Sequence, residues 1–330
     1  MNLRDLAIVQ SRKKLLHNKK IENAERTLLI TGSKNVGKTN FIHQFIEKER
    51  GITNSPSTYL LDYKFARQSN KSLMNDVCHI WELGNDVTFV SLLSVITEIK
   101  HFNSICIIIM IDLTLPETII NTMETLLNEI KKLILQFVDT CEIKENRRNF
   151  NVEEEDRNYL DPFPIPLLII GGKYDLFQNM EPVKKKIICQ YLRCLAHILQ
   201  ADLLFYSNND STLIKKTRDF LLYYGFGITN HKNSVVTDYN KPLKIPAGSD
   251  SFRSIQDSLT TTVNYSLDKY KNKLIAHCDQ KHKKEEPLPD DPAREMNFEE
   301  PEIDNLCKQK TEDLKHIKEK ILVMQSIKQN

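Results

Sequence analysis

Eight consecutive residues have the spacing of a phosphate-binding loop, G-x-x-x-x-G-K-T. Glycines at the first and sixth positions let the backbone turn so that successive N–H groups face one anion. The lysine supplies positive charge to the outer phosphates of a nucleotide, and the threonine hydroxyl is a ligand for Mg²⁺. The candidate phosphate-binding residues are Gly32, Ser33, Lys34, Asn35, Val36, Gly37, Lys38 and Thr39.

The sequence on both sides of this loop supports the same chemistry. The loop follows an apolar segment with the composition of a strand, Leu28–Ile30, and it opens an amphipathic helix that includes Phe41, Ile42 and Phe45. The motif is informative only between a strand and a helix, whose positive end then faces the phosphates. A plain strand–turn–helix without a ligand is the alternative, and phosphate binding is the favoured interpretation.

Glu82 is the candidate partner of Thr39 in a metal site. It lies in the sequence W-E-L-G, which ends at Gly84. Small GTPases of the Ras type have D-x-x-G here, where the aspartate reaches Mg²⁺ through water and the glycine senses the γ-phosphate. Glutamate is one methylene longer, and Asn85 and Asp86 stand where a glutamine would orient the attacking water. The sequence therefore predicts Thr39 and Glu82 as metal residues and slow or absent hydrolysis.

A second string, G-K-Y-D at residues 172–175, follows an apolar strand and resembles the guanine-recognition pattern N-K-x-D. In that pattern the aspartate, here Asp175, accepts hydrogen bonds from the base, and the stem of the lysine, here Lys173, covers the base plane. Gly172 stands in place of the asparagine. Ser207, after the next strand, fits a third base-pocket position, whereas Asn208 does not match. The expected cofactor is a guanine nucleotide, GDP or GTP, with Mg²⁺, in a site that is either occupied or a vestige.

These residues need a fold that brings the carboxyl ends of several strands to one edge. Short apolar runs alternate with longer amphipathic segments, which is typical of an α/β fold with buried parallel strands. The expected strands are 27–31, 77–83, 105–111, 166–170 and 201–206, with a weaker one at 57–62. The expected helices are 38–48, 86–97, 116–137, 182–199 and 212–224. The predicted class is α/β: a Ras-like P-loop NTPase fold with a mostly parallel sheet between helices, and helical or extended N- and C-terminal extensions.

The composition changes along the chain and predicts four regions. Residues 1–24 are an N-terminal arm, and residues 25–255 form the nucleotide-binding domain. A highly charged stretch, 141–161, is expected to be a solvated insertion in that domain. Residues 256–302, rich in charge and proline in their second half, are expected to be a linker, and 303–330 a C-terminal amphipathic helix.

The overall composition excludes several classes of protein. There are 46 basic and 44 acidic residues, a net charge of +2, which is too even for a surface that binds nucleic acid directly. No apolar run approaches the roughly 20 residues of a membrane span, and the first residues are too polar for a signal peptide. The seven cysteines are an odd number without zinc spacing, so we expect free thiols inside the cell.

Several strings together resemble the dynein light intermediate chain family, and within it the form of cytoplasmic dynein 2. The resemblance covers about residues 25–255. Two of the strings, W-E-L-G and D-P-F-P-x-P, are unusual, and generic GTPases have neither. The matching segments are T-G-S-K-N-V-G-K-T at 31–39, H-I-W-E-L-G at 79–84, L-D-P-F-P-I-P at 160–166 and G-K-Y-D at 172–175.

The resemblance implies a non-catalytic motor subunit whose Ras-like domain packs on the dynein 2 heavy chain, together with other dynein 2 subunits. It implies retrograde intraflagellar transport and cilium assembly on microtubules, with force from the ATPase of the heavy chain. The implied locations are the cytoplasm, the cytoskeleton and the cilium, at its axoneme and basal body. The chain departs from a working GTPase in the region that corresponds to switch I. Lys64 follows Asp62 and Tyr63 there, and Thr58 is the nearest threonine for a second Mg²⁺ contact.

Three functions compete on the sequence alone. The first is a structural subunit with a nucleotide pocket that stabilises it or is a vestige. The second is a small GTPase-like switch with slow GTP hydrolysis. The third is a P-loop kinase or other nucleotide enzyme. It needs substrate-binding acids and a lid with arginines, and the chain shows no such cluster beyond Arg147 and Arg148. The first is the favoured interpretation.

The C-terminal segment has apolar residues at alternating steps of three and four, the spacing of a heptad seam. Lys310 interrupts the seam, and charged residues occupy the other faces. Such a narrow stripe buries little by itself. The segment therefore either folds back on its own domain, frays, or reaches across the linker to pack on the heavy chain. The seam residues are Ile303, Cys307, Leu314, Ile317, Ile321 and Met324.

Overall fold

The structure is a computed structural model that describes residues 25–46, 58–69, 75–84, 89–90, 92, 104–137, 154–228, 234–256, 267–278 and 300–329. The expected N-terminal arm (1–24), most of the expected helix 86–97 and the insertion up to residue 153 lie outside the described residues. The chain divides into two compact units between residues 282 and 283, and each is described by itself.

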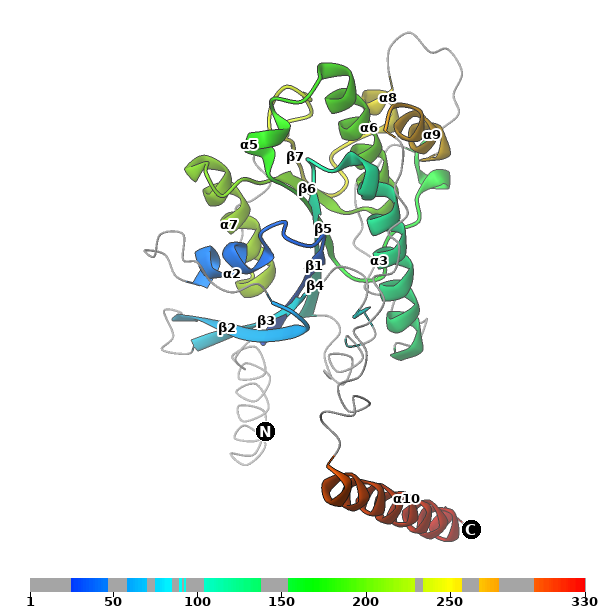
Figure 1. The fold of residues 1–330 in the computed structure, drawn as a ribbon. Helices are drawn as coiled ribbons and strands as arrows, with labels where there is room; N and C mark the ends of the chain where they lie inside the picture. Colours follow the sequence, from blue (N-terminus) through cyan, green and yellow to red (C-terminus); the bar gives the residue numbers. More distant parts are fainter. Residues whose placement is uncertain are drawn as a thin grey trace, which may run out of the picture. The chain divides into compact units, whose positions relative to one another are not determined.

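In the described part of the first unit, seven strands form one sheet in the order β2-β3-β1-β4-β5-β6-β7 (Figure 1). Strands β3, β1, β4, β5 and β6 run parallel, and β2 and β7 pair antiparallel at the two edges. Parallel strands are buried on both faces, which is why β4 is an unbroken apolar run up to its final aspartate. The strands are β1 (Arg26–Gly32), β2 (Leu61–Ser69), β3 (Asn75–Leu83), β4 (Ile105–Asp112), β5 (Leu167–Gly172), β6 (Asp202–Phe205) and β7 (Lys244–Ile245).

Helices cover both faces of this sheet and make a three-layer sandwich (Figure 1). Helices α2 and α7 pack on one face, and α3 and α6, with α8 and α9, pack on the other. The described helices are α2 (Lys38–Ile46), α3 (Pro116–Phe137), α5 (Tyr174–Phe177), α6 (Pro182–Leu199), α7 (Ser211–Phe226), α8 (Phe252–Ile255) and α9 (Leu267–His277), with a 3-10 turn, η3, at Arg157–Tyr159.

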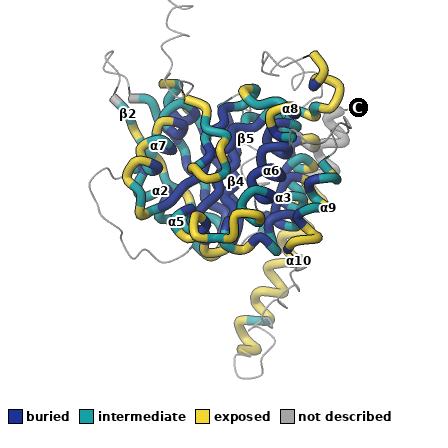
Figure 2. The backbone as a smooth tube through the Cα atoms, turned by 90° about the horizontal axis from the view of Figure 1, so that it is seen from above, coloured by how far each residue is buried: buried dark blue, intermediate teal, exposed yellow. Residues whose placement is uncertain are grey.

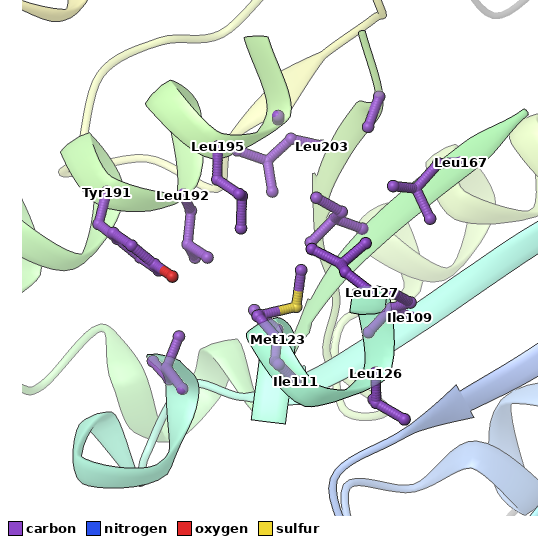
Figure 3. Close-up of a cluster of buried hydrophobic side chains, with 14 of the residues drawn as sticks. Ile109, Ile111, Met123, Leu126, Leu127, Leu167, Tyr191, Leu192, Leu195 and Leu203 are labelled. Carbon is purple, nitrogen blue, oxygen red and sulfur yellow. The ribbon is translucent and has the colours of Figure 1, made fainter. Parts of the chain in front are cut away.

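The larger hydrophobic cluster lies between the sheet and helices α3 and α6 (Figure 3). Each fully buried aliphatic side chain of this kind contributes about 1.5–3 kcal/mol. The tube view shows the central strands buried and enclosed by partly exposed helices (Figure 2). The sheet is therefore a rigid platform for the loops at its carboxyl edge. The side chains labelled in the close-up are Ile109, Ile111, Met123, Leu126, Leu127, Leu167, Tyr191, Leu192, Leu195 and Leu203.

Most predicted elements of the first unit are confirmed, and the α/β Ras-like fold with them. The helices predicted over 116–137 and 182–199 match α3 and α6 in both bounds. The edge strands were predicted poorly: the strand expected at 57–62 is wrong, because β2 begins at Leu61 and continues to Ser69. The two-residue strand β7 was not expected, since so short an edge strand has no periodicity of its own.

The assignment of residues 256–302 to a linker is wrong for the described residues 267–278. Helix α9 lies in that range, and its Tyr270 and Leu274 are buried in the larger cluster. The helix is mostly polar, so its two buried residues, one turn apart, form too narrow a stripe to stand out in the sequence. The first unit therefore includes this helix in its α3 and α6 layer.

The solvated insertion expected at 141–161 is also wrong at one described position. Asp156 is buried, and its carboxylate lies 2.9 Å from Nε2 of His197 on α6. The same carboxylate accepts a hydrogen bond from the backbone N–H of Phe252. This acid connects the segment after the insertion to α6 and α8, because its hydrogen-bond partners are inside the fold.

The second unit contains one long described helix, α10 (Pro301–Gln329), which confirms the predicted C-terminal helix. The large apolar side chains described on this helix are more than half exposed, and Figure 2 shows the helix mostly in the colour of exposed residues. They are the seam residues Ile303, Leu314 and Ile317 and the neighbouring Leu306.

Two expectations from composition can be checked on the described residues. None of the described helices is long and apolar enough to cross a bilayer. The six cysteines in the described part of the chain form no disulfide. Burial raises the pKa of the Cys78 thiol to about 12, so this side chain stays protonated and unreactive at neutral pH.

Candidate nucleotide site

The phosphate-binding motif forms the connection between β1 and α2, at the carboxyl edge of the sheet (Figure 1). Three of its residues have left-handed backbone angles: Gly32 with φ of +133°, Asn35 with 58° and Gly37 with 100°. Such angles reverse the chain within a few residues and turn N–H groups toward a common centre. The structure thus brings the eight predicted residues, 32–39, into one tight loop that opens a helix.

Lys38 is the first residue of α2, and its side chain is buried within the loop. The ammonium donates hydrogen bonds to the carbonyl oxygens of Gly32 at 2.8 Å and Ser33 at 2.9 Å. These two bonds fold the lysine back over the loop and fix the position of its charge. A positive charge held against inward-turned N–H groups is a suitable place for the phosphates of a nucleotide.

The two predicted metal residues are in direct contact. The Thr39 hydroxyl donates to Oε1 of Glu82 at 2.7 Å, across the gap between α2 and β3. Glu82 is buried, and within the described residues its other oxygen, Oε2, has no hydrogen-bond partner. A hydroxyl beside a buried carboxylate with an open oxygen fits Mg²⁺, which binds oxygen ligands and usually keeps several waters. Thr39 and Glu82 would hold the ion, which would add positive charge at the phosphates.

Gly84 does not offer the γ-phosphate contact that the D-x-x-G comparison predicts. Its N–H donates to the carbonyl oxygen of Leu60 at 2.6 Å, just before β2. A Cβ atom on Gly84 would lie 2.3 Å from the carbonyl oxygen of Thr58. The backbone of residues 58–60 therefore rests directly on this glycine, and its N–H is already used in the protein.

The predicted base-binding residues meet at the ends of β5 and β6. Asp175 accepts hydrogen bonds from the Ser207 hydroxyl at 2.8 Å and from Nδ2 of Asn209 at 2.9 Å. The two partners fix the orientation of the carboxylate, and a carboxylate with about four lone-pair sites can still accept from a base. The geometry of Asp175 and Ser207 suits guanine recognition, and Asn209 is an additional support that the sequence did not suggest.

Lys173 forms an ion pair across the edge of the sheet. Its Nζ lies 2.5 Å from Oδ2 of Asp112, the buried last residue of β4. Oδ1 of the same aspartate accepts from the backbone and hydroxyl of Thr114, and its backbone N–H donates to the Ser33 hydroxyl. Asp112 therefore connects the phosphate loop to Lys173, the predicted base-binding lysine. The only sign of it in the sequence was an acid that ends an apolar run.

The departure of Gly172 from the N-K-x-D pattern has a steric cause. A Cβ atom at this position would lie 2.6 Å from Cγ2 of Val36, so any side chain would force Val36 of the phosphate loop to shift. The neighbouring strand instead brings Asn208 to the loop: its Nδ2 lies 3.7 Å from where a Cβ atom on Gly37 would be. Its Oδ1 contacts the Tyr206 hydroxyl, which burial keeps protonated by raising its pKa. The side-chain amide of Asn208, from the turn after β6, thus lies beside the phosphate loop, although Asn208 does not match the base-pocket pattern.

Comparisons with curated proteins give three relatives of similar length to this chain. It is 33% identical over 314 residues to the cytoplasmic dynein 2 light intermediate chain 1 of Danio rerio, with 89% of this chain and 86% of the relative covered. It is 32% identical to the proteins of the same name from Mus musculus, over 315 residues, and Homo sapiens, over 321 residues. In both cases 90% of this chain and 88% of the relative are covered.

Among solved structures, the fold is similar to that titled crystal structure of the dynein light intermediate chain's conserved domain. The TM-score is 0.57 at 14% sequence identity, covering 82% of this chain and 95% of that one. At this identity the similarity concerns the fold. No protein-family model matches the chain.

Proposed function

The chain belongs to the cytoplasmic dynein 2 light intermediate chain family, and we propose that it is a non-catalytic subunit that binds the dynein 2 heavy chain. The observation that supports this role most directly is similarity along about nine tenths of the chain to curated dynein 2 light intermediate chains. The described part of the site agrees with a subunit that does not turn over nucleotide, because Gly84 offers no N–H to a γ-phosphate.

The proposed setting is retrograde intraflagellar transport and cilium assembly, with the heavy chain and other dynein 2 subunits as partners. The protein would then be found in the cytoplasm and along ciliary microtubules, at the axoneme and the basal body. Its contribution is to stabilise the motor, while the heavy chain hydrolyses ATP.

We propose further that the loop binds a guanine nucleotide, which stabilises the Ras-like domain. Lys38 and the loop N–H groups would contact the phosphates, and Asp175, oriented by Ser207, would accept from the base. Because no water-positioning glutamine follows Gly84, the bound nucleotide would persist. A switch that alternates between GDP and GTP is the second candidate, favoured only by the Thr39–Glu82 pair that could hold Mg²⁺.

Replacing Lys38 with alanine is expected to abolish stabilisation by GDP. A ligand at one hundred times its dissociation constant raises the free energy of unfolding by about 2.7 kcal/mol. The side chain also holds two loop carbonyls, so the variant will be less stable without nucleotide as well. The measurement is therefore the difference in melting temperature with and without GDP, compared between wild type and variant.

The matched control for this experiment is Lys215→Ala, which removes an exposed lysine from α7, outside the loop. It should keep the GDP-dependent increase in melting temperature. ADP at the same concentration should stabilise the wild type less than GDP does, since Asp175 would not find the two guanine donors. If GDP does not change the melting temperature of the wild type, the loop does not bind nucleotide.

The apolar stripe of α10 is our proposed second contact with the heavy chain. A helix with so exposed a stripe needs a groove on a partner to bury it. Replacing Ile317 with aspartate places a charge in the stripe and is expected to weaken co-purification with the heavy chain by about tenfold or more. The melting temperature of the Ras-like domain should stay the same.

Lys315→Asn is the control for this substitution. It changes the net charge by the same amount, and position 315 lies about 200° around the helix from 317, on the opposite face. Its co-purification with the heavy chain should equal that of the wild type. A loss of domain stability in Ile317→Asp would instead mean that the stripe packs on its own domain, and unchanged association would mean that it has no partner.

A further inference from the structure

Glu82 is a negative charge inside the site whose compensation is incomplete. Only 2% of its surface is exposed. Thr39 donates to Oε1, whereas Oε2 has no hydrogen-bond partner in the described part of the chain. A buried carboxylate in this state needs a cation close by, because desolvation of the charge is costly.

A cation close to that open oxygen is Lys64 on β2. Its Nζ lies 3.9 Å from Oε2 of Glu82 and also donates to the carboxylate of Asp62. Asp62 is directly opposite Glu82 in the antiparallel pairing of β2 and β3. Two like charges directly opposite each other destabilise an antiparallel pair of strands. An ammonium that is ion-paired with both carboxylates therefore stabilises this edge of the sheet.

The pleat of β2 directs Lys64 toward the phosphate loop. Alternate residues of a strand share a face, so Asp62 and Lys64 point to the same side of the sheet. Lys64 is opposite Ile80, which packs in the cluster beneath α2. Thr39, on the same helix, contacts Glu82. The lysine thus approaches Glu82 from the side on which nucleotide phosphates and their metal would lie.

Resting on the nucleotide binding proposed above, we propose that Lys64 is a built-in cation that replaces Mg²⁺ at Glu82. The site then binds nucleotide almost equally well with and without the metal. A Mg²⁺ ion at Oε2 would be close to the ammonium, which lies 3.9 Å from the same oxygen, so the two cations would compete for one carboxylate. The lysine is attached to the sheet, whereas Mg²⁺ must lose part of its hydration shell to bind.

The test is the affinity of the full-length protein for a fluorescent GDP, measured in excess Mg²⁺ and again in excess EDTA. The wild-type dissociation constant should differ by less than about threefold between the two media, whereas in Lys64→Met it should be about tenfold weaker in EDTA and recover with Mg²⁺. In the double variant Lys64→Met/Glu82→Gln the metal dependence should disappear again, because the buried carboxylate is gone and the remaining one, Asp62, is exposed to solvent.

Two controls separate charge from position. Lys64→Arg keeps the charge and should behave like the wild type. Arg67→Met removes a cation from the opposite face of the same strand and should also leave the metal dependence unchanged.

The inference is overturned if wild-type affinity falls more than about tenfold in EDTA, or if folded Lys64→Met keeps the wild-type ratio. If Lys64→Met does not fold, the ratio of the wild-type dissociation constants in EDTA and in Mg²⁺ is the deciding measurement. Absence of GDP binding to the wild type in both media is a different result. It overturns the proposed nucleotide binding, and the inference with it.

Discussion

Replacing Gly32 with alanine is expected to lower the free energy of unfolding by more than about 4 kcal/mol, in the exceptional range for one substitution. At this glycine φ is +133°, a region closed to side chains. A Cβ atom there would lie 1.8 Å from the carbonyl oxygen of Met110 on the neighbouring strand β4. Because the obstacle is backbone in the centre of the sheet, no rotamer change can relieve it. Urea unfolding followed by circular dichroism measures the effect.

Gly37→Ala is the control for this substitution. This glycine also has a left-handed angle, with φ of +100°, but a Cβ atom would meet only Nδ2 of Asn208, at 3.7 Å. The cost is then backbone strain without a clash, about 1–3 kcal/mol. Equal losses in the two variants would contradict the steric explanation for Gly32.

The sequence was sufficient for features whose physical cause is local. Buried parallel strands produce unbroken apolar runs, so β4 and the elements around it could be located. The phosphate loop could be located as well, because the backbone angles that require its glycines all arise within eight consecutive residues. The long helices α3 and α6 have enough turns for their periodicity to fix both ends.

The features that escaped prediction depend on partners far away in the chain. In the sequence, Lys64 is an ordinary charged residue of an edge strand. Its role appears only when the β2–β3 register places Asp62 opposite Glu82 and brings the lysine close to both carboxylates. Asp112 gains its role only when β5 brings Lys173 beside it. Asn208 does not match the base-pocket pattern, and only the structure shows that its amide lies close to Gly37 of the phosphate loop.

Buried charges outside the site were missed for the same reason. Asp156, in a charged stretch typical of a solvated loop, and Asp250, in a polar segment, both find cationic or polar partners on α6. A single sequence cannot distinguish such residues from solvated ones, because burial is decided by the tertiary fold. These contacts fix the segment after β7 and the segment after the insertion against helix α6.

Removing the carboxylate of Asp250 is expected to be nearly as damaging as the Gly32 substitution. It accepts two hydrogen bonds from Arg193 on α6, to Oδ2 from Nε at 2.8 Å and to Oδ1 from Nη2 at 2.7 Å, and both side chains are buried. Arg193 also donates to the Ser254 hydroxyl in α8. Asp250→Ala would leave a guanidinium charge inside the protein without its counter-ion, at a cost of about 3–5 kcal/mol.

The exposed ion pair between Lys131 and Asp161, with an Nζ–Oδ2 distance of 2.8 Å, is the matched comparison. Asp161→Ala should cost no more than about 1 kcal/mol, because solvent already screens that pair. Replacing both buried partners, as in Arg193→Met/Asp250→Leu, should recover much of the stability lost in Asp250→Ala, since no charge then remains buried. The free energies of unfolding are measured in urea for the wild type, Asp250→Ala, Asp161→Ala and the double variant. If Asp250→Ala is no less stable than Asp161→Ala, the buried pair does not hold α8 and the segment before it against α6.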